Sequence, residues 1–153
     1  MNHSLVQKRE FKVATTRDAF AVLCIQVYGR FGQEALPLIR DVCYKLGAAA
    51  GERMKKDLPA TDFKTLAAAT VQSGTQTKGR IEAIEVSENR MHIREYTCEL
   101  GLTNTSLDLC RAMMEIDRAR IEAITGKKIR FQIPKSLAAG DEYCDVICTS
   151  EVS

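Results

Sequence analysis

The stretch RIEAIEVSENRMHIREYTC, residues 80–98, decides the fold of this 153-residue chain. Its two halves, 80–86 and 90–98, are rich in β-branched and aromatic residues, and the turn-prone SEN segment separates them. Two such runs around a short polar link are typical of a β-hairpin. We therefore predict two antiparallel strands, of which the second ends at Cys98.

A long helix is expected after the hairpin. The segment SLDLCRAMMEIDRARIEAI, residues 106–124, carries apolar residues at helical spacing. Thr105 can cap its start, with Asp108 in the favourable first turn. Gly126 can take the left-handed conformation that commonly ends a helix. The sequence therefore predicts one helix between these two ends.

Two further strands complete this part of the chain. In IRFQI, residues 129–133, apolar side chains alternate strictly with polar ones, which is typical of a half-buried strand. In EYCDVIC, residues 142–148, Cys144, Val146 and Cys148 share one face. The order of the unit, over about residues 80–149, is β-β-α-β-β.

Residues 15–72 favour helices. Thr15 or Thr16 can cap the first helix, Pro37 fits the first turns of the second, and Asp62 can cap a third. Spacings of three and four residues predict two buried stripes, formed by Phe20, Leu23, Cys24, Val27 and Phe31 on the first helix and by Leu36, Ile39, Val42, Cys43, Leu46 and Ala50 on the second.

Two glycines four residues apart, Gly47 and Gly51, leave one face of the second helix without side chains. Another backbone can approach closely there, either within the domain or across a dimer seam. Packing within the domain is the favoured alternative, because tight packing offsets the helix penalty of glycine, about 1 kcal/mol.

Composition limits the class of protein. With 45% hydrophobic residues and no long linker, residues 1–153 are expected to form a single domain with a full-sized core. The formal charge is +2, and the cationic residues are dispersed among acidic ones. The sequence therefore predicts no basic surface of the kind that binds nucleic acid. No signal-peptide pattern and no apolar run long enough to span a membrane are present, so we expect a cytoplasmic protein without a membrane span.

Six cysteines in a reducing compartment favour free thiols over disulfides. Cys24 and Cys43 lie on helical core stripes and are expected to be small buried side chains. Cys98, Cys110 and Cys144 each lie near the end of an element, so they either line one shared pocket or are ordinary core residues.

Asp117 lies on the apolar stripe of the long helix, between Met114 and Ile121. A carboxylate that faces a core is costly unless it is paired or used. Two interpretations remain open: an ion pair with Arg94 or Arg130 at the edge of the core, or a role in a ligand pocket.

The order of elements, together with Cys98, Asp117 and the Gly140-Asp141-x-x-Cys144 segment, resembles a known superfamily. It includes ligand-binding domains of the vinyl-reductase type, TRAPP vesicle-tethering subunits and the L-2-amino-thiazoline-4-carboxylic acid hydrolase group. The resemblance is greatest to this last group and covers about residues 20–148. It implies an α+β fold, with N-terminal helices packed on a twisted antiparallel sheet of about four strands.

The resemblance also implies site residues and partners. Cys98 or Cys144 would be a nucleophile or pocket thiol, and Asp117 a general base. The ligand-binding residues implied are Arg94, Cys110, Met114 and Arg130. A homodimer is expected by the same likeness, with the first two helices at its seam.

No metal site and no cofactor are expected. A zinc-binding sensor variant of the superfamily resembles Glu-x-x-Cys-x7-Cys before the final strand, but Ile133 and Ser136 hold the first two places here. Two functions remain open. One is a hydrolase that opens a thiazoline-like ring at its C=N carbon; the other is a sensor or carrier that encloses a small organic molecule or lipid without chemistry.

Overall fold

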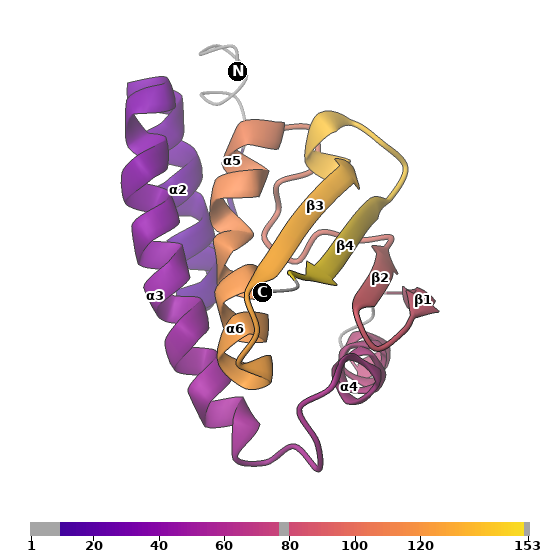
Figure 1. Cartoon of the computed structure of the whole chain (residues 1–153). Coiled ribbons are helices and arrows are strands. Elements are labelled where there is room, and N and C mark those ends of the chain that lie inside the picture. Colours follow the sequence, from indigo (N-terminus) through magenta and orange to yellow (C-terminus); the bar gives the residue numbers. More distant parts are fainter. Residues whose placement is uncertain (1–9, 77–79, 152–153) are drawn as a thin grey trace.

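The computed structural model describes residues 10–76 and 80–151, with an α+β architecture (Figure 1). In chain order the elements are α2 (Thr16–Phe31), the 3-10 turn η1 (Gly32–Ala35), α3 (Leu36–Lys55), α4 (Phe63–Gln76), β1 (Ile81–Val86), β2 (Arg90–Glu95), α5 (Leu107–Met113), α6 (Glu115–Thr125), β3 (Ile129–Lys135), η2 (Leu137–Ala139) and β4 (Cys144–Ser150). Helices α5 and α6 lie between the α2–α3 pair and the sheet. No helix in the described ranges is long and apolar enough to cross a membrane.

The sheet has four antiparallel strands in the order β1-β2-β4-β3, as the α+β prediction requires. β4, the last strand in sequence, lies between β2 and β3. The second hairpin strand is shorter than predicted, because β2 ends at Glu95 and Cys98 lies in the turn that follows. Met91 and Ile93 of β2 face the helices, whereas His92 and Arg94 face away from them.

Helix α2 begins at a capping box, in which Thr15 Oγ1 accepts a hydrogen bond from the Asp18 backbone at 3.1 Å. Its buried face is formed by Ala21, Cys24, Ile25 and Tyr28. The predicted stripe is therefore wrong at Leu23 and Phe31, which are 61% and 55% exposed. The packed face is formed in part by small Ala21 and half-polar Tyr28. A stripe chosen from the largest apolar residues includes neither of them.

The second helix begins as predicted, with Pro37 in its first turn. Its buried residues are Leu36, Ile39, Cys43, Gly47 and Gly51. Val42 and Leu46, predicted to be core, are 43% and 45% exposed. The two glycines face α6, and this orientation turns Val42 and Leu46 outward.

Gly47 and Gly51 let α3 and α6 approach closely within the chain. A Cβ on Gly47 would overlap the Ile116 carbonyl, and one on Gly51 would lie 2.6 Å from the Arg120 carbonyl oxygen. The favoured alternative, packing within the domain, is therefore correct for this glycine pair.

Helix α4 begins after Asp62, whose Oδ1 accepts a hydrogen bond from the Thr65 backbone at 2.7 Å, so the predicted cap is present. Phe63, Leu66 and Ala67 pack beneath β1 and β2 against Met91 and Ile93, which hold this helix to the sheet.

The single helix predicted over residues 106–124 is two helices, α5 and α6, which meet at Met114. The cap is Ser106 rather than Thr105, because Ser106 Oγ accepts from the Leu109 backbone at 3.3 Å. Gly126 ends α6 with φ 66°, as predicted. The break lies two residues before Ile116, whose carbonyl packs against α3.

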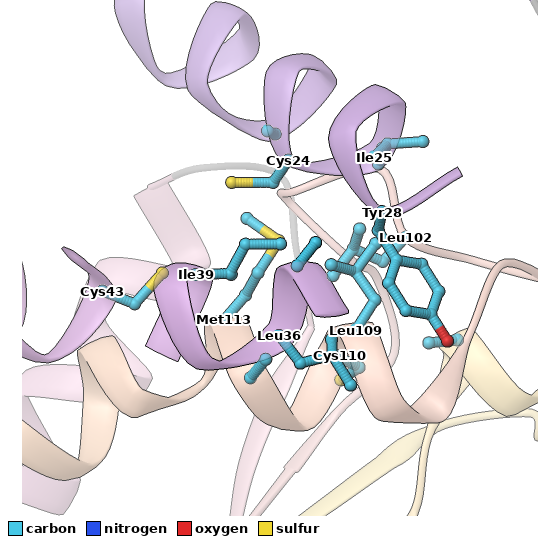
Figure 2. Close-up of a cluster of buried hydrophobic side chains, with 14 of the residues drawn as sticks. Cys24, Ile25, Tyr28, Leu36, Ile39, Cys43, Leu102, Leu109, Cys110 and Met113 are labelled. Atoms are coloured by element: carbon cyan, nitrogen blue, oxygen red, sulfur yellow. The ribbon is translucent and has the colours of Figure 1, made fainter. Parts of the chain in front are cut away.

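Buried side chains form two clusters rather than one. The first joins α2, α3 and α5, and Figure 2 shows its labelled members Cys24, Tyr28, Cys43 and Met113. The second joins α4, α6 and the sheet. Met114 and Phe131 pack against both clusters. The helix break therefore lies at the seam between two cores.

Candidate functional site

Three cysteines from different segments lie close to one another near the η2 turn. Cys98 lies in the turn after β2, and its Sγ accepts a hydrogen bond from the Leu102 backbone at 3.4 Å. Cys144 opens β4, and its Sγ accepts one from the Leu137 backbone at 3.3 Å. On α5, Cys110 Sγ accepts one from the Ser136 hydroxyl at 3.4 Å. Each thiol is thus fixed by a donor from a neighbouring segment.

Of the two alternatives for Cys98, Cys110 and Cys144, a shared pocket or ordinary core positions, the structure shows only that the three lie close together. Cys110 and Cys144 contact adjacent residues, Ser136 and Leu137, at the start of the η2 turn. Each of the two also interacts electrostatically with Cys98. The other three cysteines, Cys24, Cys43 and Cys148, are buried in the clusters described above.

Burial keeps the thiols of Cys110 and Cys144 protonated. It raises the pKa of Cys110 to about 11, and burial also raises the pKa of Cys144 above its ordinary value. Since the thiolate is the reactive form of cysteine, neither sulfur is prepared as a nucleophile. Cys98 and Cys144 retain partial exposure, whereas Cys110 is buried.

The turn that holds Cys110 and Cys144 is the Gly-Asp segment singled out in the sequence. Asp141 Oδ2 accepts from the Ser136 backbone at 2.8 Å, and the Ser136 carbonyl accepts from the Asp141 backbone at 3.1 Å. Gly140 has φ 96°, a left-handed value that favours glycine. Ser136, whose position in the sequence pointed only to the missing zinc motif, is fully buried.

Glu95 is a site residue that sequence reasoning missed. It is the last residue of β2 and pairs in register with Cys144, on the same face as Met91 and Ile93. Burial, and then the negative charges of Asp117 and Glu99, raise the pKa of Glu95 to about 7. Within the described ranges, its carboxylate has no hydrogen-bond or ion-pair partner. Strict alternation along β2 was the signal that would have found it.

Asp117 does lie beside the site, where it raises the pKa of Glu95. Its partner, however, is Arg120, one turn further along α6. The suggested pairing with Arg94 or Arg130 is wrong, because both arginines lie on the other face of the sheet.

The structure therefore does not bring Arg94 and Arg130 to the cysteines, whereas Cys110 and Met114 lie there. Arg94 instead holds the buried Asp145, with Nε and one terminal nitrogen at 2.8 and 3.1 Å from its two carboxylate oxygens. Hydrogen bonds from its guanidinium lower the pKa of Asp145, and burial of the carboxylate opposes this change. The guanidinium also stacks 4.0 Å from the centre of the Tyr143 ring. Arg94, Asp145 and Tyr143 therefore form a cluster that stabilises the sheet on the face opposite to the helices.

A cavity of about 220 Å³ lies beside residues 99–101, which follow Cys98. Its lining consists of Glu10, Phe11, Lys12, Asp18, Ala21, Val22, Ile25, Glu99, Leu100 and Gly101. None of the predicted site residues lines it. In the part of the chain that the structure describes, no group of three His, Cys, Asp or Glu side chains is arranged to hold a metal ion.

Comparison with known proteins gives a family and a fold. The sequence profile described as L-2-amino-thiazoline-4-carboxylic acid hydrolase matches residues 13–148. No curated protein sequence matches the chain.

Similar solved structures include the phenol-responsive sensory domain of the transcription activator PoxR with phenol, at TM-score 0.65 and 13% identity over 91% of this chain and 76% of that one. A TRAPP subunit 3 from Naegleria fowleri, covalently bound to palmitic acid, gives 0.62 and 12% over 89% and 93%. An H-NOX protein from S. oneidensis in the Fe(II)NO state gives 0.57 and 14% over 95% and 83%. At these identities the likeness concerns the fold.

Proposed function

Because the chain belongs to the L-2-amino-thiazoline-4-carboxylic acid hydrolase family, we propose that it binds a small heterocyclic carboxylate and hydrolyses its ring at the C=N carbon. The ligand lies at the seam between the two cores, beside Cys98, Cys144 and Met114. Asp117 and Cys110 border the same place.

The observation that supports this proposal is the gathering of Cys98, Cys110, Cys144 and Glu95 close to the η2 turn. Strands β2 and β4, helix α5 and the turn after β2 each contribute one polar or polarisable side chain, and Met114 supplies apolar surface beside them. Binding sites for small molecules commonly have this character, in which a few placed polar groups orient a ligand within an apolar lining.

Arg120 is the cation that we assign to the ligand's carboxylate. Its side chain is about one-third exposed and lies on α6 beside Asp117. Its positive charge lowers the pKa of Glu95. A guanidinium presents a planar fork of donors that suits a carboxylate. That Arg94 and Arg130 contact the ligand stays a prediction. Both side chains lie on the face of the sheet opposite to the proposed ligand position.

A second function, a sensor or carrier without chemistry, is favoured by the state of the thiols. The pKa of Cys110 is raised to about 11 by burial, and the pKa of Cys144 is raised by the same cause. A covalent route through Cys98 or Cys144 therefore lacks an evident activating group. Binding of a small organic molecule or lipid at the same seam needs no such activation.

We further propose a cytoplasmic homodimer. α3 exposes Leu38, Val42 and Leu46 along one line, and α2 exposes Leu23 and Phe31. Exposed apolar side chains that recur on adjacent helices are candidates for a protein interface. Light scattering over a range of protein concentrations tests the assembly, and a monomer at every concentration would contradict it.

The functional test uses purified protein and L-2-amino-thiazoline-4-carboxylate. Calorimetry measures binding, and mass spectrometry detects a product that is one water heavier than the substrate. Turnover supports the hydrolase, and saturable binding without turnover supports the sensor or carrier. The absence of both would overturn the assignment to this substrate class. Glu85→Gln, on the exposed face of the sheet and paired with Arg90, is a control expected to behave as the parent protein.

A further inference from the structure

We propose that Glu95 moves the proton in the hydrolysis at this site, taking it from the attacking water and returning it to the leaving sulfur. The inference rests on the proposed hydrolase function. It changes the chemistry of that function, because the nucleophile becomes water and the cysteines become lining residues.

Position is the first support. Glu95 and Cys144 are paired in register at the same end of neighbouring strands, and both side chains point toward α6. The negative charge of Glu95 contributes to the raised pKa of the Cys144 thiol. A carboxylate at this place lies at the centre of the candidate site, next to the sulfur that has partial exposure.

Charge is the second support. The groups that face Glu95 are Asp117 and Arg120 from α6, Glu99 from the turn after β2, and Cys144 from β4. Burial and the two carboxylates raise the pKa of Glu95, Arg120 lowers it, and the result is about 7. An acid–base group works best when its pKa lies near the working pH, since both protonation states are then accessible.

Neighbouring groups fit the proton-transfer role less well. Asp117 is paired with Arg120 on its own helix, so one of its carboxylate oxygens already has a charged partner. Burial raises the pKa of Cys110 and of Cys144, which makes proton release from either thiol unfavourable at neutral pH. Within the described ranges, the Glu95 carboxylate has no fixed partner and is available to a water molecule.

The reaction balances with this one group. In a protonated 2-amino-thiazoline ring, the carbon between sulfur and the two nitrogens is electrophilic. A water oxygen forms a bond to that carbon while Glu95 takes a proton from the water, giving a neutral tetrahedral intermediate. The carbon–sulfur bond then breaks, the electron pair leaves with sulfur, and the proton on Glu95 passes to the thiolate. The urea that forms still carries the proton with which the ring began, and it releases this proton to solvent. Overall one water is added, and the product is an open-chain urea with a free thiol.

The experiment compares the parent protein with Glu95→Gln, Glu95→Asp and the control Glu85→Gln. We expect Glu95→Gln to lower kcat by about a hundredfold or more, the range of general acid–base catalysis, with binding of the substrate largely kept. Glu95→Asp should recover part of the activity because it restores a carboxylate. Melting temperatures of all variants, measured at the assay pH, separate loss of chemistry from loss of fold.

The pH profile is the readout that a merely structural role would not move. For the parent protein, kcat/KM should rise with pH around a midpoint near the Glu95 pKa of about 7. Asp117→Asn removes a negative charge that raises this pKa, so the midpoint should move to lower pH. If Glu95→Gln is folded and retains full activity, or if the midpoint is unchanged in Asp117→Asn, the assignment is wrong. If the parent protein binds without turnover, the hydrolase function itself is wrong, and this result is distinct from the other two.

Discussion

Replacing Glu95 with Gln should raise the stability of the protein at neutral pH and leave it nearly unchanged in mild acid. In the folded protein the pKa of Glu95 is raised from 4.5 to about 7 by burial and by Asp117. The folded state therefore holds a proton that the unfolded chain has already released. Stability should fall as the pH rises between these values, by about 1.4 kcal/mol per pH unit.

The full effect of that change in pKa is about 3 kcal/mol at pH 8. Glu95 is only partly buried, so screening by solvent reduces the expected gain to about 2 kcal/mol. Gln has nearly the same shape and does not titrate, so the difference between the two proteins isolates this one carboxyl.

Urea melts at half-unit steps from pH 4.5 to pH 8 measure the difference. Parent and variant should coincide near pH 4.5 and separate steadily up to about pH 7, with equal slopes against urea. Glu85→Gln, on the exposed face, is the control and should show no such separation. A difference between parent and Glu95→Gln that is the same at every pH would refute the raised pKa and, with it, the electrostatic description of the site.

Three further results are expected. Gly47→Ala should cost about 2 kcal/mol in urea melts, because the new methyl group meets the α6 backbone. Under a soluble thiol reagent, mass mapping should find Cys98 labelled in the native protein and Cys43 protected, since Cys43 is fully buried. Arg94→Ala should cost about 2 kcal/mol at pH 7, because Asp145 stays buried without its main partner. That loss should shrink in acid, since the pKa of Asp145 is lowered in the folded protein and protonation removes the unpaired charge.

Most of the fold could be predicted from the sequence, because each strand and each helix cap depends on a local sequence pattern. Residue composition around a turn identified the hairpin strands, and side-chain alternation identified the later ones. Thr15 and Asp62 were correct as caps, and Gly126 was correct as a helix end. The errors arose where distant packing decides. The break at Met114 accompanies the approach of α6 to α3, and no property of residues 106–124 alone requires it.

The candidate site could be predicted from the sequence only in part. The convergence of Cys98, Cys110 and Cys144 followed from their positions near element ends. Glu95 was missed although the alternation of β2 puts it on the buried face, because the predicted strand runs on to Cys98 whereas the strand ends at Glu95. The partner of Asp117 depends on side-chain orientation along α6, which helical spacing leaves undetermined.

The strand order β1-β2-β4-β3 has a consequence for synthesis of the chain. The central strand β4 comes last, so β2 and β3 have no shared neighbour until residues 144–150 have left the ribosome. Until then, the inner edges of both strands carry unpaired backbone donors and acceptors, which can pair with another nascent chain. Translation stalled before β4 should therefore yield the form that aggregates or needs a chaperone. A pause placed after β4 should yield protease-resistant protein.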